Sequence, residues 1–322
     1  MTFHGTALVT GAGGFIGSHL CERLLQEKYR VIGLDAFTAY YPRPIKERNL
    51  AELRVRPEFT FVEMDLSQAD PTPLVAEADV IFHQAGQPGV RASWGKEFDL
   101  YLHHNIWATQ KLLEAVKGST RLRRLVFASS SSVYGETQDL PLREESLPRP
   151  YSPYGVTKLA AEHLCGLYHA NYGVPTVALR YFTVYGPRQR PDMGFHKFIR
   201  AALEDRPIPV YGDGEQTRDF TYVADAVEAN WLALAPGAAG HVFNIGGGSR
   251  SSVNQVLTTL EEIIGRPIRR EARPPEKGDV RHTWADTDRA RHMLGFSPRV
   301  SLGEGLAQEV KWLKGLSGTT AA

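Results

Sequence analysis

Cysteine is scarce in this sequence of 322 residues, which contains only Cys21 and Cys165. Neither belongs to a CxxC pattern, so a disulfide framework or a zinc site is not expected. Apolar runs long enough to span a membrane are also missing. The N-terminus runs directly into a strand-like segment, without the charged and apolar regions of a signal peptide. We therefore expect a soluble, cytoplasmic protein with no membrane partner.

A surplus of one charge sign is absent as well. The chain has 37 Lys and Arg against 36 Asp and Glu, which gives a formal net charge of +1. This balance gives no reason to expect nucleic acid as a partner, although it is compatible with a local basic pocket. The apolar fraction of 42% is typical of a globular protein with a sizeable core.

Apolar runs and amphipathic stretches alternate through the first half of the chain. Predicted strands begin at Thr6, Arg30, Phe59, Asp79, Arg124 and Pro175. Helical spacing covers residues 15–27, 99–117, 153–171, 223–234, 253–264 and 302–313. The alternation predicts an α/β fold with a doubly wound parallel sheet of the Rossmann type. After about Arg180 Pro and Gly become frequent, which is typical of pocket-lining loops, and we expect a smaller α+β domain there.

The stretch VTGAGGFIGSHL places Gly11, Gly14 and Gly17 between the first predicted strand and the first predicted helix. Residues without side chains let the backbone turn tightly and let a pyrophosphate approach the helix N-terminus. The helix dipole favours negative charge at that position. A plain tight turn is the alternative interpretation of the glycines taken alone.

Acidic residues at two strand ends strengthen the nucleotide interpretation. Asp35 ends the second predicted strand, where a carboxylate can bind both ribose hydroxyls. The following AFTAYY offers no Lys or Arg for a 2′-phosphate, which favours NAD over NADP. Asp65 ends the third predicted strand, where it could accept a hydrogen bond from the adenine amino group or cap a helix.

Two further motifs are SSSSVYG at Ser129–Gly135 and SPYGVTK at Ser152–Lys158. Together with TGAGGFIG, HQAGQPGVRAS, RYFTVYGPRQRPDM, YGDGEQTRDFTYVADA and GDVRHTWADTDRA, they make nearly the whole chain resemble the extended short-chain dehydrogenase/reductase superfamily. Within it the chain resembles nucleotide-sugar epimerases, and UDP-glucuronic acid 4-epimerases in particular. One departure is HQAG at His83, where the family more often has an apolar residue and a second Ala. We expect this to alter the wall beside the nicotinamide ribose slightly.

The resemblance implies an NAD-binding domain in residues 1–180, to which a segment at about 213–245 returns. Residues 181–322 would mainly bind a UDP-sugar. The residues implied for the cofactor, NAD, are Gly11, Gly14, Phe15, Ile16, Gly17, Asp35, Asp65, Leu66, Gln84, Ala85, Tyr154, Lys158 and Tyr181.

The catalytic residues implied are Ser130, Tyr154 and Lys158. Oxidation of an alcohol requires a base for the hydroxyl proton, and a free phenol with a pKa of about 10 is a poor one at neutral pH. Lys158 follows Tyr154 by one helical turn, so both side chains lie on one face. The ammonium of Lys158 and the charge of oxidised NAD are expected to favour the phenolate. Ser130 would hydrogen-bond the same substrate oxygen.

Single residues distinguish between neighbouring reactions. Nucleotide-sugar dehydratases carry an Asp-Glu pair before VYG and UDP-glucuronate decarboxylases carry a Glu, whereas this chain has Ser131 and Ser132. Thr183 stands where hexose epimerases and decarboxylases usually have Asn. The three hydroxyls suit a substrate that itself carries a carboxylate, which favours a uronic acid over a neutral hexose. Thr183 as an ordinary strand residue is the alternative.

The UDP end of the substrate is expected to contact arginines. Arg218 and Arg281 match family positions that bind the diphosphate, which suits the paired donors of a guanidinium. Arg91 and Arg190 either point into the same cleft or are solvated at the surface. The residues expected to contact the uracil ring are Val210, Tyr211 and Gly212. No metal is expected, because the spacing of His103, His104 and His282 does not suit metal binding, and we interpret these histidines as structural.

The predicted reaction is 4-epimerisation of a UDP-sugar, most simply UDP-glucuronic acid to UDP-galacturonic acid, through a 4-keto intermediate with tightly bound NAD. A UDP-glucose/UDP-galactose 4-epimerase, a UDP-glucuronate decarboxylase or another NAD-dependent nucleotide-sugar oxidoreductase are the alternatives. A non-catalytic NAD-binding regulator is disfavoured because Ser130, Tyr154 and Lys158 are all present.

The resemblance also implies a homodimer. In the family, the helices corresponding to residues 99–117 and 153–171 pair with their copies as a four-helix bundle. The residues expected to give the second helix an apolar outer surface are Ala160, Ala161, Leu164 and Leu167. Packing of these residues within the monomer is the alternative.

Overall fold

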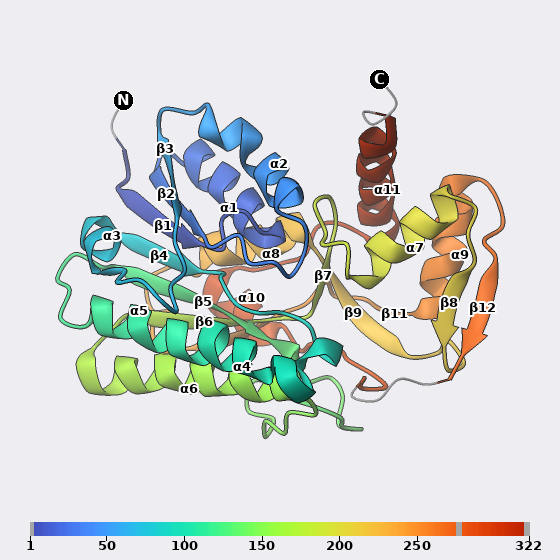
Figure 1. Ribbon diagram of the computed structural model, residues 1–322. Helices are drawn as coiled ribbons and strands as arrows, with labels where there is room; N and C mark the ends of the chain where they lie inside the picture. Colours follow the sequence, from blue (N-terminus) through green and yellow to red (C-terminus); the bar gives the residue numbers. More distant parts are fainter. Residues whose placement is uncertain (1–2, 275–278, 319–322) are drawn as a thin grey trace.

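A seven-stranded parallel sheet forms the centre of the larger lobe in the computed structural model, which describes residues 3–274 and 279–318 (Figure 1). The strand order is β10-β6-β5-β4-β1-β2-β3, so the order reverses beside β1 as in Rossmann-type sheets. Its strands are β1 (Thr6–Thr10), β2 (Arg30–Asp35), β3 (Phe59–Glu63), β4 (Val80–His83), β5 (Arg124–Ser130), β6 (Thr176–Tyr181) and β10 (Val242–Ile245). The predicted α/β fold is confirmed.

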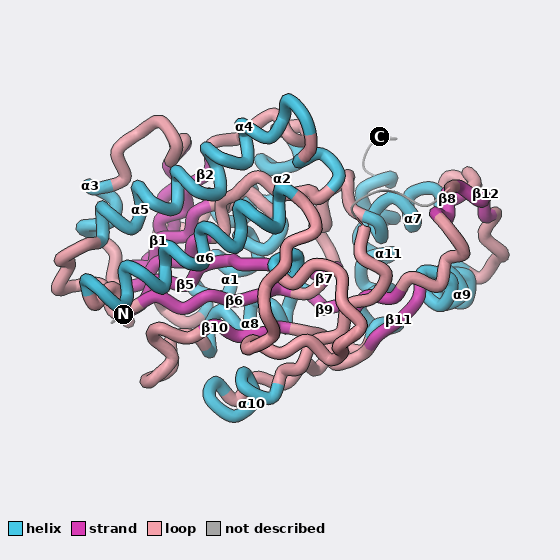
Figure 2. Tube along the Cα trace, turned by 90° about the horizontal axis from the view of Figure 1, so that it is seen from below, coloured by secondary structure: helices cyan, strands magenta, loops and turns pink. Residues whose placement is uncertain are grey.

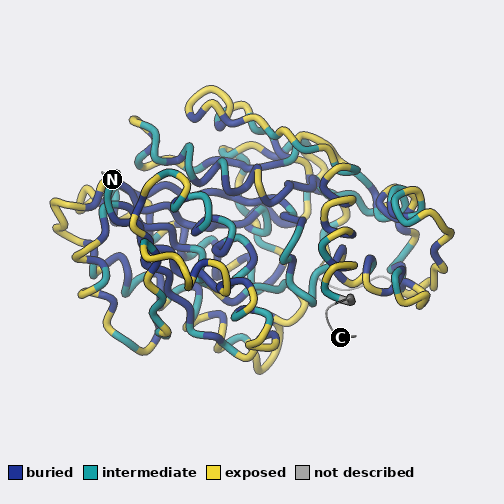
Figure 3. The backbone as a smooth tube through the Cα atoms, turned by 90° about the horizontal axis from the view of Figure 1, so that it is seen from above, coloured by how far each residue is buried: buried dark blue, intermediate teal, exposed yellow. Residues whose placement is uncertain are grey.

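Helices cover both faces of this sheet, because its central strands are apolar on both sides. Every residue of β1 and β5 is buried. One face is covered by α1 (Phe15–Gln26), α2 (Arg43–Arg54) and α8 (Val223–Leu232), and the other by α3 (Thr72–Glu77), α5 (Ala108–Val116) and α6 (Pro153–Tyr172). The buried core lies between these layers (Figure 3). Among these helices, α2 and α3 were not predicted.

The predicted helix over residues 99–117 is interrupted. It consists of α4 (Phe98–Tyr101), a π-helical segment at Leu102–Trp107, and α5. A π segment carries one extra residue per turn and often marks a functional site. Here it turns Asn105 into the core, where only 1% of the residue is exposed. Figure 2 shows α5 and α6 lying side by side on this face.

The smaller lobe, which includes α7, α9, β8 and β12 in Figure 1, is built from residues after the sixth strand. One sheet joins β7 (Thr183–Tyr185), β9 (Thr217–Tyr222) and β11 (Arg250–Ser252), and another pairs β8 (Ile208–Tyr211) with β12 (Arg270–Arg273). The helices of this half are α7 (Gly194–Leu203), α9 (Val253–Ile264), α10 (Asp288–Leu294) and α11 (Leu302–Gly318). Of these, α10 packs against the edge strand β10 of the large sheet. Within the described residues, no helix has the length and apolar character needed to cross a membrane.

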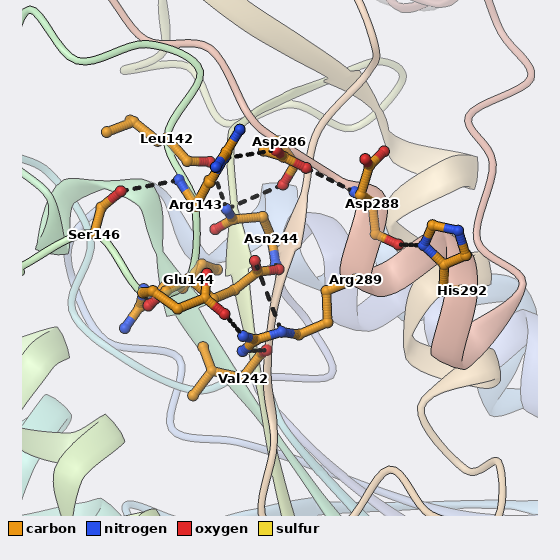
Figure 4. A network of polar contacts seen from close by, with 12 residues as sticks. Leu142, Arg143, Glu144, Ser146, Val242, Asn244, Asp286, Asp288, Arg289 and His292 are labelled. Carbon is orange, nitrogen blue, oxygen red and sulfur yellow. Dashed lines mark hydrogen bonds and ion pairs between the residues drawn. The ribbon is translucent and has the colours of Figure 1, made fainter.

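Strand β10 is an edge of the large sheet, and polar side chains cover it (Figure 4). The backbone N–H of Asn244 donates to Glu144 Oε1 (2.8 Å), and the Asn244 amide donates to Leu142 O (2.9 Å). Arg289 of α10 pairs with the same acidic segment through Glu144 and Glu145. These contacts satisfy an edge that would otherwise be open to another strand. They also anchor the segment that leads into α6.

A buried ion pair connects α6 to the sheet. Arg180 of β6 donates to both carboxylate oxygens of Glu162, at 3.0 and 2.6 Å, and each side chain is only 5% exposed. Ser129 of β5 donates to Glu162 as well, at 2.6 Å, and Arg180 also donates to the hydroxyl of Tyr134. The pair therefore fixes α6 against the ends of β5 and β6.

Removal of one partner leaves the other charge buried without compensation. We expect Glu162→Ala to lower the free energy of unfolding by about 3–5 kcal/mol. Glu204→Ala, which breaks solvent-exposed pairs with Arg200 and Arg206, is the control and should change the free energy of unfolding little. Urea unfolding followed by circular dichroism measures both, and equal midpoints for the two variants would contradict the assigned role of the buried pair.

Candidate active site

A deep cavity opens at the carboxyl ends of the large sheet, where β1 and β4 meet. Every residue that the sequence assigned to the cofactor lines it, from Gly11 to Tyr181. The glycine loop has no room for side chains: a Cβ on Gly17 would lie 2.1 Å from Gly11 O, and one on Gly11 would lie 2.8 Å from Ala85 N. Gly11 also has a positive φ of 72°. The N-terminus of α1 thus stays open to a pyrophosphate.

Asp35 lies at the end of β2, where it organises the ribose end of the cavity. Its carboxylate accepts hydrogen bonds from the backbone of Gly13 (3.0 Å) and Phe37 (2.8 Å). The ammonium of Lys46, from α2, lies 3.1 Å from the same carboxylate and lines the cavity too. Lys46 lies beyond the six residues AFTAYY that follow Asp35, so the sequence did not predict this contact. Because Asp35 is present and pairs with this lysine, the site still disfavours a 2′-phosphate.

Asp65 lies in a turn after β3, and the next helix, α3, begins only at Thr72. Its carboxylate accepts from the backbone N–H and the hydroxyl of Ser67, each at 2.8 Å, which makes an Asx-turn rather than a helix cap. The hydrogen bond to the adenine amino group stays a prediction. Asp65 also lines the cavity together with Leu66. His104 lies 3.8 Å from Asp65 and lines the cavity, a position that its interpretation as a structural histidine did not foresee. Within the described residues, no group of His, Cys, Asp and Glu side chains is arranged to hold a metal ion.

The HQAG departure builds a polar ring into the cavity wall. The Gln84 amide donates to Asn230 Oδ1 (2.9 Å), and Asn230 donates to the hydroxyl of Tyr181 (2.7 Å). Tyr181 in turn donates to Gln84 Oε1 (3.3 Å). Asn230 of α8 is fully buried, and Gln84 and Tyr181 both line the cavity. This ring fixes the wall that we expect beside the nicotinamide.

Ser130, Tyr154 and Lys158 meet where β5 ends and α6 begins. Ser130 is the last residue of β5, and its hydroxyl accepts from the backbone N–H of Ser132 (3.1 Å). Tyr154 lies in the first turn of α6, which Ser152 caps by accepting from the N–H of Gly155. The Lys158 ammonium donates to Ala128 O (2.9 Å) and is buried. Tyr154 and Lys158 both line the cofactor cavity.

Burial shifts the pKa values of Tyr154 and Lys158 in opposite directions. Burial raises the pKa of Tyr154, and the Ser130 hydrogen bond and the charge of Arg190 offset part of that rise. Burial lowers the pKa of Lys158 to about 8.

A chain of hydrogen bonds joins the first turn of α6 to the wall of the large cavity. Thr157 donates to Tyr154 O, and Asn105 of the π segment donates to Thr157 Oγ1 (3.0 Å). Asn105 also exchanges hydrogen bonds with the backbone of Gln87, which lines the cavity. The N–H of Gln87 donates to Asn105 Oδ1 at 2.7 Å. The π segment therefore sets the position of the first turn of α6.

His83 extends this chain to the glycine-loop strand. It lies between the hydroxyls of Thr10 (2.8 Å) and Thr109 (3.0 Å). Thr109 donates to Asn105 O and Thr10 accepts from Ala85 N–H, so His83 donates through Nε2 and accepts through Nδ1. Burial lowers the pKa of His83 to about 3, which agrees with this neutral tautomer. His83 is a fully buried link rather than a cavity wall.

A second, smaller cavity is lined by chain neighbours of the catalytic residues, since Ser131 and Ser132 follow Ser130 and Ser152 precedes Tyr154 by two residues. Ser131, Ser132 and Thr183 line it together, beside Arg218. The Arg218 guanidinium donates to Thr217 O (2.9 Å), and burial lowers its pKa, which marks a desolvated cation suited to a phosphate. Asp279 and Ser152 also line this cavity. The hydroxyl cluster expected from the sequence thus lies in one place.

Five residues assigned to the substrate do not line this second cavity. Arg190 lines the cofactor cavity instead, and Arg91 pairs with Asp279 (2.7 Å) over the ring of Tyr211. Val210 is buried in β8, and Arg281 forms an exposed bidentate ion pair with Asp213. The roles given to Arg91, Val210, Tyr211 and Arg281 remain predictions.

Comparison with known proteins agrees with this geometry. Residues 7–246 match the family described as NAD dependent epimerase/dehydratase. A UDP-glucuronate 4-epimerase from Thermodesulfobacterium geofontis is 39% identical over 96% of this chain and 96% of its own length. An uncharacterised UDP-glucose epimerase from Bacillus subtilis is 47% identical over 96% and 98%.

Solved structures show the same likeness. The crystal structure of UDP-glucuronic acid 4-epimerase from Bacillus cereus, in complex with UDP-glucuronic acid and NAD, superposes with a TM-score of 0.94. It is 46% identical and covers 97% of this chain and 99% of that protein. The chain therefore belongs to the NAD dependent epimerase/dehydratase family.

Proposed function

We propose that this protein is a UDP-glucuronic acid 4-epimerase that interconverts UDP-glucuronic acid and UDP-galacturonic acid with NAD as its bound cofactor. The observation that carries the proposal is the cluster of Ser131, Ser132 and Thr183 in one cavity beside Tyr154 and the cofactor cavity. The relatives that bind or act on UDP-glucuronic acid, at 39% and 46% identity, support it.

The hydroxyl cluster decides between a uronic acid and a neutral hexose. Ser131, Ser132 and Thr183 can each donate one hydrogen bond to a carboxylate, and such charge-assisted bonds are stronger than neutral ones. A hydroxymethyl group at the same place would form only neutral bonds. The partly buried Arg218 lies in the same cavity, where we place the diphosphate.

Tyr154 removes the proton from the sugar 4-hydroxyl, and Ser130 holds that oxygen. NAD, when bound, accepts the hydride from carbon 4 and later returns it. Lys158 keeps its ammonium near the phenol and the ribose, where its positive charge favours the phenolate. After the sugar turns its other face, Tyr154 returns the proton, and the configuration at carbon 4 is inverted.

The 4-keto intermediate of a uronic acid is a β-keto acid, which can lose carbon dioxide. Loss requires the bond to the carboxylate to align with the carbonyl π system. Hydrogen bonds from Ser131, Ser132 and Thr183 would hold the carboxylate away from this alignment. We propose that the same cluster gives selectivity and protects the intermediate.

The first test uses the purified protein and no added cofactor. Incubation with UDP-glucuronic acid should give UDP-galacturonic acid, because bound NAD is restored in every cycle. Tyr154→Phe should abolish turnover, since it deletes the proton carrier and keeps the ring, while NAD and the UDP-sugar still bind. Product is measured by chromatography and binding by calorimetry. No product from wild type would reject the proposed reaction, and near-normal turnover by the variant would remove Tyr154 from the mechanism.

A second test addresses selectivity. We expect Thr183→Val to lower kcat/KM for UDP-glucuronic acid by about one to two powers of ten, because a hydrogen bond to a charged group contributes roughly 1.5–3 kcal/mol. UDP-glucose should be affected far less, and a decarboxylated product should increase. Rates for both substrates with both proteins give the comparison. A wild-type preference for UDP-glucose, or an unchanged ratio in the variant, would favour a UDP-hexose epimerase instead.

We also propose that residues 1–180, with α8 and β10, form the cofactor domain, and that two copies pair through the face made by α4 to α6. Ala161 cannot contribute as expected, because it is fully buried in the core against the sheet. The large apolar residues exposed between α4 and α6 are Leu100, Leu102, Trp107, Val156, Leu167 and Tyr172. Trp107 is 48% exposed and Leu167 is 56% exposed, which is unusual for side chains of this size.

Light scattering should give twice the chain mass of 35.8 kDa at micromolar concentration. Trp107→Glu should shift the protein toward the monomer, because a charge would be buried at the interface. Val55→Glu changes another exposed apolar residue, on the opposite side of the sheet, and should not alter the mass. A monomeric wild-type protein would count against the dimer.

A further inference from the structure

Tyr40 occupies a position that the proposed reaction does not use. It lies in the loop between β2 and α2, and its side chain lines the cofactor cavity. Its hydroxyl donates to Asp192 Oδ2 (3.2 Å), in the segment that follows β7. It also packs on Gly89, where a Cβ would lie 2.5 Å from the Tyr40 oxygen. One side chain thus reaches from the adenosine side of the cavity to two separate loops.

Asp192, which accepts the hydrogen bond from Tyr40, also pairs with Arg190. Its two carboxylate oxygens accept from Arg190 Nε (3.0 Å) and Nη2 (3.1 Å), a paired arrangement that fixes the plane of the guanidinium. The guanidinium lies 5.9 Å from the centre of the Tyr40 ring. Burial opposes the charge on Asp192, but Arg190 and the Tyr40 hydroxyl more than offset it, and its pKa lies below the usual value. The three side chains therefore form one hydrogen-bonded unit.

The Gly89 contact connects this unit to the catalytic tyrosine. The hydroxyl of Tyr101 lies 2.8 Å from Gly89 O and 2.9 Å from Pro88 O. The Tyr101 ring packs edge-on against Tyr154, with ring centres 6.2 Å apart. Three contacts thus connect Tyr40 to the reacting phenol, although Tyr40 belongs to the loop beside the ribose carboxylate Asp35.

We propose that Tyr40 and Asp192 are positioning residues that hold Arg190 across the cofactor cavity and so retain the bound dinucleotide between turnovers. The proposal rests on the proposed function only in taking NAD as the cofactor. An epimerase with no net redox change must return each hydride to the same sugar. If the cofactor dissociated in its reduced form, the enzyme would be left without its cofactor. The keto sugar would then lack the hydride that it must regain. Retention of the dinucleotide is therefore a chemical requirement of this reaction.

Tyr40→Phe removes the hydroxyl and keeps the ring. We expect radiolabelled NAD, bound to the holoenzyme and chased with excess unlabelled NAD, to dissociate about tenfold faster, the effect of losing one hydrogen bond to a charged group. Tyr222→Phe is the matched control, because it deletes a hydroxyl that donates to Gln308 (2.8 Å) at α11. Its release rate should equal that of wild type. Unchanged release from Tyr40→Phe, or equal acceleration in the control, would overturn the proposal.

A double-mutant cycle tests whether the residues act as one unit. Asp192→Asn keeps an oxygen acceptor but loses the charge that fixes Arg190, and should also accelerate release. The double variant should release NAD no faster than the faster single variant, because both changes open the same contact. If the acceleration of NAD release in the double variant equals the product of the accelerations in the two single variants, the two residues act independently and the positioning role is rejected. The measurement contains no sugar, so an enzyme that acts on another UDP-sugar would still give the expected rates.

Discussion

The parallel pairing of β4, β5 and β6 is the constraint on which the site depends. In this register His83 lies opposite Phe127 and Ser130 lies opposite Tyr181. The last residues of these strands therefore lie together at the carboxyl end of the sheet. The helix after β5 must then return across the sheet, and its first turn begins at the same end with Tyr154. The bond from Lys158 to Ala128 O and the Glu162–Arg180 pair hold that helix in place. A shift of one residue between these strands would turn alternate side chains away from the cavity.

Local signals made the cofactor half predictable from the sequence. Buried strands give continuous apolar runs, and closely spaced glycines at a strand–helix junction are typical of a nucleotide-binding loop. The predicted strand at Arg124 and the predicted helix over 253–264 match β5 and α9, because their boundaries carry clear start and stop residues. The helices α2 and α3 show no such pattern over a long stretch, although each has a proline near its start. Only four of the 12 residues of α2 are apolar, and α3 has only six residues in all.

Residues whose role depends on distant partners could not be predicted. Nothing near Tyr40 in the sequence indicates a bond to Asp192, and nothing near His83 indicates that it joins Thr10 to Thr109. Lys46 reaches Asp35 only because α2 packs beside the glycine loop. The π segment is also invisible in the sequence, since residues 99–117 keep ordinary helical spacing. Asn105 nevertheless depends on it, because the extra residue turns its amide into the core.

The distribution of charge explains why hydroxyls rather than a guanidinium would hold the sugar carboxylate. Arg190 could form a strong paired contact with a carboxylate, but it lines the cofactor cavity and not the cavity that holds the three hydroxyls, and Asp192 takes its Nε and one N–H of Nη2. A uronic acid bound by Ser131, Ser132 and Thr183 makes single hydrogen bonds that can be exchanged one at a time. The 4-keto intermediate must rotate inside the site. A paired contact, whose two hydrogen bonds break only together, would oppose that rotation. We infer that the Asp192 pairing leaves Arg190 as part of the wall, so that rotation of the sugar and retention of the cofactor use different groups.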